Sequence, residues 1–252
     1  MIGVMVSGGG DSMALLHLLH RVGRLVEALT IDHGLRPEAA DEAAMVAAFC
    51  AELGVPHQTS VWQHGDISGN LMDQARRARY GLAADWARAR SIAHVAVGHT
   101  ADDQAETFLI GLSRQAGLDG LSGMRQVWTE AAVTYHRPLL AVPRAELRDY
   151  LRRNGVAWVD DPTNEDAGYT RVKARRALAA LRPLGITAAK LAAVSDNLNM
   201  ARAALQRQVQ AAARAVAQGA DGVLSVARAD YDSLPLEVQR RMLIAALRWM
   251  SG

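Results

Sequence analysis

The sequence has almost no cysteine, since Cys50 is the only one among its 252 residues. A single thiol can neither close a disulfide nor build a cysteine-rich zinc site within one chain. Long hydrophobic runs are also lacking, because no apolar stretch reaches the ~18 residues of a membrane-spanning helix. No charged and apolar leader with a cleavage site is seen. We therefore expect a cytoplasmic protein that does not enter a membrane.

The sequence also has little excess charge of one sign. Its formal net charge is +2, and 21% of the residues are charged. This balance argues against a polycation that coats nucleic acid, although it allows a local basic face. Half of the residues are hydrophobic, which provides a core and excludes extended disorder. The eight histidines are scattered without the spacing of metal ligands.

Short apolar runs alternate with segments of helical periodicity in the first half of the chain. The runs that predict buried strands are residues 2–6, 25–31, 57–62 and 92–97. The segments that predict helices are residues 12–19, 37–53, 71–90 and 102–114. This alternation predicts an α/β fold with an open, mostly parallel sheet and helices on both faces.

Strand signals fade after about residue 145. Apolar residues recur every three or four positions over residues 187–218, which predicts one amphipathic helix of ~48 Å. Residues 235–249 predict a further helix. We therefore expect a catalytic domain at residues 1–185, followed by a smaller, all-helical region at residues 186–252.

The stretch "SGGGDS" follows the first predicted strand and opens the first predicted helix. Glycine amides at a helix N-terminus form an anion site, and serine hydroxyls add donors. A carboxylate beside a phosphate repels it unless a cation lies between them, so Asp11 implies Mg²⁺. The simpler alternative is a tight turn with a serine cap. The candidate phosphate-binding residues are Ser7, Gly8, Gly9, Gly10, Asp11 and Ser12.

This loop lacks the lysine of the G-x-x-x-x-G-K-[ST] motif and does not match G-x-G-x-x-G. It resembles the pyrophosphate loop of the N-type ATP pyrophosphatases. The resemblance implies an adenine nucleotide alpha hydrolase-like fold and an enzyme that cleaves ATP between its α and β phosphates. Such an enzyme adenylates a substrate oxygen and then replaces AMP with a nitrogen or sulfur nucleophile.

Two later stretches carry candidate catalytic residues. "TIDHGLRPEA" places Asp32 and Arg36 after the second strand, at the edge where open parallel sheets bind ligands. "GHTADDQAET" places His99 after the fourth strand, and Asp103 and Glu106 on one face of the next helix. Two such carboxylates are suited to an ammonium group. The alternatives are an ordinary polar turn and acidic residues that favour a helix start.

These stretches, with "RPLLAVPRAELRDYLRRNGVAWVDDPTN", resemble the tRNA(Ile)-lysidine synthetase family over about residues 2–182. The resemblance implies ATP at the first loop, free L-lysine held by Asp103 and Glu106, and His99 and Arg36 in or near the active site. It implies that the C2 oxygen of the wobble cytidine of tRNA(Ile) is adenylated, and that the lysine ε-amine then displaces AMP. The general base is left open between a carboxylate and His99, and a homodimer is also left open.

The chain departs from the family pattern in places. Met72 stands where the family commonly has Glu, and Val172 stands where it usually has Asn. Many relatives carry further C-terminal domains, so a fragment and a short form both remain open.

Residues 167–195, which follow the "DDPTN" stretch, contain six basic residues and no acidic residue. Such a cluster predicts a face that binds tRNA phosphates. The alternative is an ordinary solvent-exposed helix face. The six basic residues are Arg171, Lys173, Arg175, Arg176, Arg182 and Lys190, with a second cluster at Arg76, Arg77 and Arg79. Two other functions compete. A tRNA thiolation enzyme typically needs paired cysteines, and a non-catalytic ATP-binding module would not call for the acidic pair.

Overall fold

The computed structural model describes residues 1–34, 38–63, 69–160, 170–220 and 223–250. Its main feature is a six-stranded sheet in the order β3-β2-β1-β4-β6-β5, in which only the edge strand β5 runs antiparallel to its neighbour. The strands are β1 Ile2–Met5, β2 Val26–Asp32, β3 His57–Val61, β4 His94–Val97, β5 Val127–Glu130 and β6 Val133–His136.

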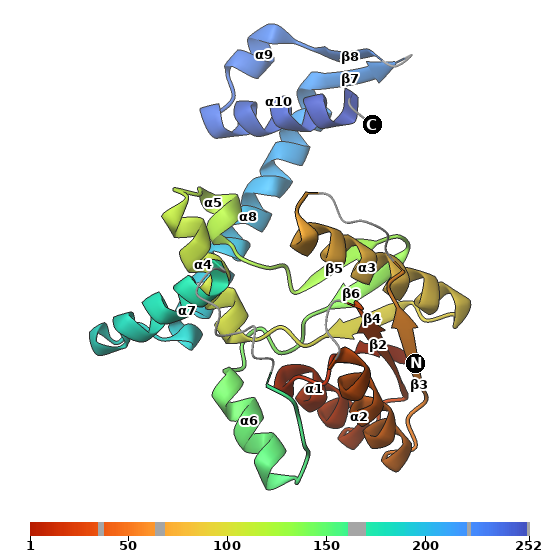
Figure 1. Cartoon of the computed structure of the whole chain (residues 1–252). Coiled ribbons are helices and arrows are strands. Elements are labelled where there is room, and N and C mark those ends of the chain that lie inside the picture. The colour runs from red at the N-terminus through yellow and green to blue at the C-terminus, as the bar shows by residue number, and fades with distance from the viewer. Residues whose placement is uncertain (35–37, 64–68, 161–169, 221–222, 251–252) are drawn as a thin grey trace.

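Helices cover both faces of this sheet, which confirms the predicted fold class (Figure 1). The helices that surround it are α1 Gly10–Arg21, α2 Ala39–Glu52, α3 Leu71–Ala89, α4 Ala101–Ser113, α5 Leu118–Leu121, α6 Arg144–Arg153 and α7 Thr170–Leu181. Alternate residues of the central strands point to opposite faces, so the core has two halves. One half packs β1 and β2 against α1, α2 and α6, and the other packs them against α3.

The strand order reverses between β1 and β4. The chain passes from β1 to β2 and β3 on one side, and β4 returns to the other side of β1. Loops that leave two such strands diverge and open a crevice at their carboxyl ends, where open α/β sheets bind ligands. The glycine-rich loop follows β1 and the His99 stretch follows β4, so both candidate motifs meet at this crevice.

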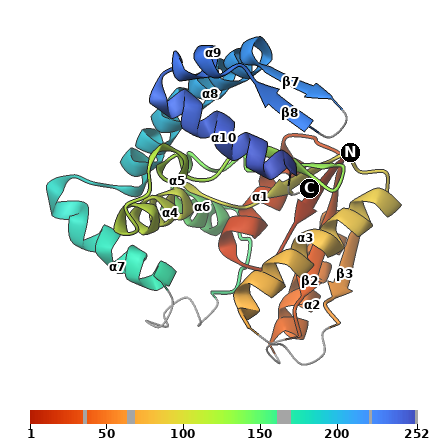
Figure 2. The same cartoon turned by 90° about the horizontal axis from the view of Figure 1, so that it is seen from above.

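The C-terminal region is built on one long helix, α8 Ala188–Val216, whose N-terminal half packs against α4 and α5 (Figure 2). The observed helix ends at Val216, two residues before the predicted end at residue 218. The region is mostly helical but not all helical, because a hairpin of β7 Ala217–Ala220 and β8 Val223–Val226 follows α8. The remaining helices are η2 Arg182–Leu184, α9 Arg228–Asp232 and α10 Leu236–Met250.

Val209, Ala212, Val238 and Met242 form a separate small core between α8 and α10. The division at residues 185 and 186 stays a prediction, since α8 contacts both parts. None of the described helices is by itself both long and apolar enough to cross a membrane.

Candidate active site

The glycine-rich loop is held in shape by its own hydrogen bonds. Gly8 has a φ of +81°, a left-handed conformation that favours glycine. The Ser12 hydroxyl donates to the Gly9 carbonyl at 2.8 Å and accepts from the Ser7 amide at 3.1 Å. The Ser12 hydroxyl hydrogen therefore supports the loop itself in this structure, so the predicted role of Ser12 as a phosphate donor stays a prediction.

Two other segments press against the loop. A Cβ on Gly98, just after β4, would lie 3.0 Å from backbone atoms of Asp11 and Ser12. The Val159 amide donates to the Gly8 carbonyl at 3.0 Å, and the Trp158 ring lies 3.3 Å from where a Cβ of Gly10 would stand. The backbone is thus fixed from both sides, which suits a preorganised anion cradle at the N-terminus of α1.

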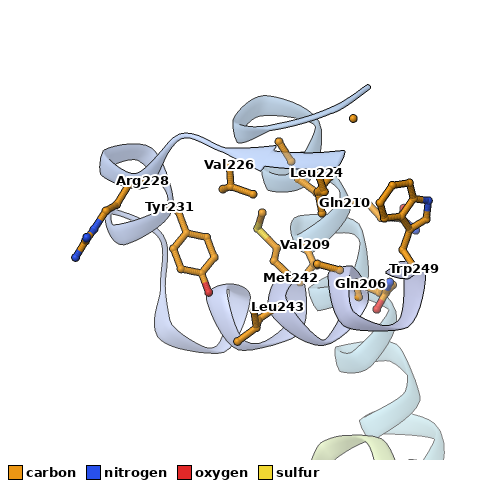
Figure 3. A pocket seen from close by; sticks show the side chains of 15 residues that line it. Gln206, Val209, Gln210, Leu224, Val226, Arg228, Tyr231, Met242, Leu243 and Trp249 are labelled. Carbon is orange, nitrogen blue, oxygen red and sulfur yellow. The ribbon is translucent and has the colours of Figure 1, made fainter. Parts of the chain in front are cut away.

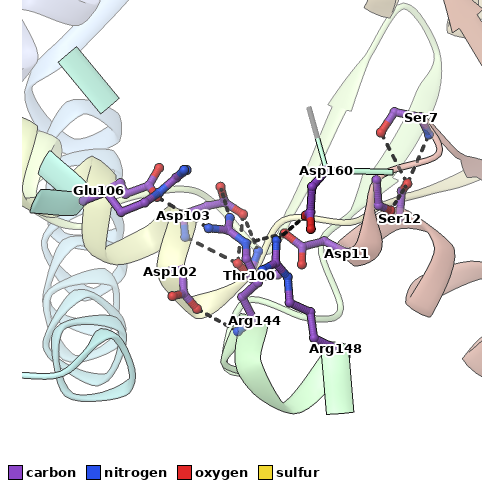
Figure 4. Close-up of polar contacts among 12 residues, drawn as sticks. Ser7, Asp11, Ser12, Thr100, Asp102, Asp103, Glu106, Arg144, Arg148 and Asp160 are labelled. Atoms are coloured by element: carbon purple, nitrogen blue, oxygen red, sulfur yellow. Dashed lines mark hydrogen bonds and ion pairs between the residues drawn. The ribbon is translucent and has the colours of Figure 1, made fainter. Parts of the chain in front are cut away.

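Asp11 lies in the first turn of α1, and its two carboxylate oxygens have different surroundings. Its Oδ2 accepts from Arg144 Nε at 2.8 Å, whereas its buried Oδ1 has no hydrogen-bond partner among the described residues (Figure 4). Burial raises the pKa of Asp11, although Arg144 acts against this rise. An orphaned carboxylate oxygen beside an anion cradle fits Mg²⁺, which prefers oxygen ligands. The described residues hold no cluster of three His, Cys, Asp or Glu for a metal, so phosphate and water oxygens would complete its coordination.

Asp103 caps helix α4 and also faces the site. Its Oδ2 accepts from the amide and hydroxyl of Thr100 at 2.8 and 3.0 Å, which completes a capping box. Its Oδ1 accepts from Arg144 Nη2 at 3.2 Å. Burial acts to raise the pKa of Asp103, but Arg144 and the Thr100 amide outweigh it and lower that pKa. The same side chain therefore caps the helix start and contacts Arg144, and its role toward a substrate ammonium stays a prediction.

Glu106 lies one turn further along α4, and its side chain is only 1% exposed. Its Oε1 accepts from Arg175 Nε at 2.9 Å and lies 3.7 Å from Arg144 Nη1. Its Oε2 is buried without a hydrogen-bond partner among the described residues. Burial raises the pKa of Glu106, and Arg175 opposes the rise. Guanidinium groups therefore stand here where an ammonium group was predicted.

His99 follows β4 and is held by Arg137. The His99 Nδ1 accepts from Arg137 Nε at 3.1 Å, and the Arg137 guanidinium lies 3.9 Å from the centre of the Trp128 ring. Because arginine only donates, this bond assigns a neutral imidazole with its proton on Nε2. Burial lowers the pKa of His99 to about 4. The only basic nitrogen of His99 is occupied, which argues against His99 as the general base.

The buried neutral state of His99 predicts a pH effect on stability. The unfolded chain, with a pKa near 6.5, binds a proton that the folded chain accepts only near pH 4, so the free energy of unfolding falls as pH drops through this window. His99→Gln is expected to make that fall shallower. Urea unfolding of both proteins at pH 7.0 and 5.0 measures the difference, and an unchanged slope would contradict the assignment.

Asp32, another predicted site residue, is the last residue of β2. Asp32 Oδ1 accepts from the Gly34 amide at 2.8 Å, which is the local turn considered as its alternative. The neighbouring His33 accepts from Arg79 Nε at 3.4 Å. Asp32 thus stands at the same edge of the sheet but outside the ion-pair network, and Arg36 lies outside the described residues.

Arg144 was not predicted from the sequence, but it contacts all three carboxylates of the site. It is the first residue of α6, and its backbone amide donates to Asp102 Oδ2 at 2.7 Å. Its side chain contacts Asp11, Asp103 and Glu106. No spacing rule identifies it, because these partners lie on α1 and α4, far away in the sequence.

The basic residues of α7 divide into two groups. Arg171, Lys173 and Arg176 are exposed, whereas Arg175 turns inward to Glu106. Val172 is 6% exposed and packs inside, so an apolar residue fits the position where the family usually has Asn. The exposed group lies on the helix that supplies Arg175, next to the crevice.

A second hollow lies far from this crevice, in the C-terminal region (Figure 3). It has a volume of about 770 Å³ and lies between α8, the β7-β8 hairpin and α10. Its lining is mostly apolar, with Tyr231, Met242 and Trp249 among its larger side chains, and the described residues that line it include no carboxylate. Arg228 is the one charged side chain in this described lining, and no glycine-rich loop or acidic residue accompanies it, so the crevice remains the candidate active site.

Comparisons with known proteins show the family of this chain. A family model described as a PP-loop domain matches residues 1–181. The tRNA(Ile)-lysidine synthase of Bradyrhizobium diazoefficiens is 39% identical over 96% of this chain and 71% of its own length. The chain belongs to the tRNA(Ile)-lysidine synthase family. The enzyme of that name from Ruegeria pomeroyi is 48% identical over the whole chain. This chain spans 61% of the length of that relative.

The fold is also found in a solved structure. A U34-tRNA thiolase from Methanococcus maripaludis, described with its [4Fe-4S] cluster, superimposes with a TM-score of 0.67. The match covers 78% of this chain and 71% of the thiolase, at 15% sequence identity. At that identity the likeness concerns the fold alone.

Proposed function

We propose that this chain uses ATP to ligate lysine to C2 of the wobble cytidine of tRNA(Ile) with a CAU anticodon. The products are lysidine, AMP and pyrophosphate. The observation that carries the proposal is the meeting of two sites in one crevice. Asp11 borders a preformed anion cradle, and the buried pair Asp103 and Glu106 lies across a single arginine from it.

The first step forms a bond between the cytidine C2 oxygen and the α-phosphorus, and the bond to pyrophosphate breaks. The amides of Gly8, Gly9 and Gly10 and the N-terminus of α1 would hold the departing phosphates. Bound at Asp11 Oδ1, Mg²⁺ would supply charge neutralisation for the phosphate oxygens. Asp11 contributes the carboxylate that this requires, from the first turn of α1.

The second step forms the bond between the lysine nitrogen and C2, and the bond from C2 to the AMP oxygen breaks. The nitrogen must lose protons as it attacks. Glu106 Oε2 is a buried acceptor with no partner among the described residues, so it is the atom we assign to the substrate ammonium. We also assign to Glu106 the role of accepting the proton that the lysine nitrogen loses. Burial raises the pKa of Glu106, and the basic nitrogen of His99 already accepts from Arg137.

The competing functions fit less well. Cys50 lies fully buried in α2, and burial raises the pKa of its thiol to about 11, so this chain's cysteine is unsuited to sulfur transfer. A module that only holds ATP has no use for a buried carboxylate pair beside the phosphate cradle.

The direct test supplies labelled ATP, lysine and a tRNA(Ile) transcript with a CAU anticodon, and measures pyrophosphate and AMP. The matched control is the same transcript with uridine in place of the wobble cytidine. We expect AMP release only with the first transcript and lysine together. Equal release with both transcripts, or none with either, would contradict the proposal.

The exposed basic residues of α7 are expected to bind tRNA phosphates. Replacing Lys173 and Arg176 together with Glu should raise the KM for tRNA about tenfold at 50 mM salt and much less at 500 mM, because salt screens such contacts. Arg175 is left unchanged because it contacts Glu106. Steady-state kinetics at both salt concentrations measure the effect. An unchanged KM at low salt would show that these residues are solvent-exposed without binding tRNA.

The remaining expectations of the sequence are kept as proposals. They are L-lysine as the nucleophile, a cytoplasmic location and a homodimer.

A further inference from the structure

Arg144 occupies both ends of the proposed active site at once. Its Nε donates to Asp11 at 2.8 Å, its Nη2 donates to Asp103 at 3.2 Å, and its Nη1 lies 3.7 Å from Glu106. Asp11 belongs to the phosphate end, whereas Asp103 and Glu106 belong to the amine end. One guanidinium therefore stands where two ligands are expected to act.

The surroundings allow the Arg144 guanidinium to leave its carboxylate partners. The Arg144 side chain is 19% exposed, and its backbone is anchored separately by Asp102. Among the described residues, the carboxylates of Asp11, Asp103 and Glu106 share two guanidinium partners, those of Arg144 and Arg175. The orphaned oxygens of Asp11 and Glu106 mark where positive charge is still lacking.

An arriving triphosphate would offer Arg144 a better partner. Asp11 is the second residue of α1, directly after the glycine-rich loop, so the Arg144 guanidinium stands beside the phosphate cradle. A guanidinium group forms bidentate hydrogen bonds with phosphate oxygens. A divalent cation at Asp11 would also repel the Arg144 guanidinium from that carboxylate. Both effects favour release of Arg144 from the carboxylates.

We propose that Arg144 closes the amine site in the nucleotide-free protein and turns to the triphosphate when ATP binds, which opens Asp103 and Glu106 to the lysine ammonium. This inference rests on the proposed function. It makes Arg144 a positioning residue that couples the two substrates and orders their binding, with the nucleotide first. By linkage, lysine then strengthens nucleotide binding by the same factor.

Isothermal titration with lysine tests this, in the absence and presence of Mg²⁺ and α,β-methylene-ATP, which cannot be cleaved between its α and β phosphates. In the wild type we expect the nucleotide to tighten lysine binding at least about tenfold. In Arg144→Met, lysine alone should bind about tenfold more tightly than to the wild type, because its competitor is gone. The coupling should fall to about twofold or threefold, the residual attraction between triphosphate and ammonium.

Arg148→Met is the matched control, because it makes the same change one turn along α6 at a residue that pairs with Asp160. It should retain the wild-type affinities and coupling. Arg144→Gln serves if Arg144→Met does not fold. Loss of a merely structural arginine would weaken lysine binding and leave the coupling unchanged, and that result would overturn the inference alone. Failure of the wild type to bind either ligand would instead overturn the proposed function.

Discussion

Asp11→Asn is expected to lower the rate of pyrophosphate release about 1,000-fold, equivalent to about 4 kcal/mol of transition-state stabilisation. The physical reason is the loss of the charge that would hold Mg²⁺ against the phosphates. The amide is isosteric and can still accept from Arg144, so the loop geometry is kept. Burial opposes the charge of Asp11, so removing that charge should not unfold the protein.

The measurement is single-turnover release of labelled pyrophosphate with saturating tRNA. Asp85→Asn is a suitable control, since Asp85 is an exposed residue of α3 that pairs with Arg88. Raising the Mg²⁺ concentration should recover part of the activity of Asp11→Asn, because the metal is then bound by phosphate alone. Wild-type turnover in this variant would remove the metal role assigned to Asp11.

Glu106→Gln is expected to separate the two chemical steps. A charged hydrogen bond in a buried site contributes about 1.5–3 kcal/mol, so the KM for lysine should rise about 10-fold to 100-fold. In the proposed mechanism, adenylation of the tRNA does not involve Glu106. Exchange of labelled pyrophosphate into ATP, which depends on tRNA but not on lysine, should therefore remain within about threefold of the wild type.

The two assays are run on the same preparation, with a thermal melt to show that the variant folds without its full ion pair to Arg175. Glu146→Gln on α6 is the control, since Glu146 is exposed. An equal loss in both assays would indicate that Glu106 supports the whole crevice rather than the amine.

The sequence predicted the central strands and the helices between them. These strands are continuous apolar runs, and the helices show a clear 3.6-residue hydrophobic periodicity. The strands β5 and β6 were missed, since four-residue segments such as "VWTE" and "VTYH" carry too short an alternation to separate them from loops. The hairpin was missed because β7 consists of "AQGA", which has no β-branched or aromatic residue, although an Asp-Gly dipeptide follows it in the sequence.

The site was predictable where its residues lie in one loop or one helical turn. The glycine-rich loop with Asp11, and Asp103 with Glu106, are such local patterns. Arg144 and Arg175 were not predictable as site residues, because they meet their carboxylates across 41 and 69 residues of chain. Only the folded sheet, with its reversal of strand order between β1 and β4, brings these groups together.

The most direct measurement is a crystal structure with Mg²⁺, α,β-methylene-ATP and lysine. We predict the phosphates on the amides of residues 8–10, the metal on Asp11 and the lysine ammonium on Glu106, with Arg144 turned to the phosphates. A nucleotide bound elsewhere, for example in the apolar hollow beside α10, with the glycine-rich loop unoccupied, would contradict the account.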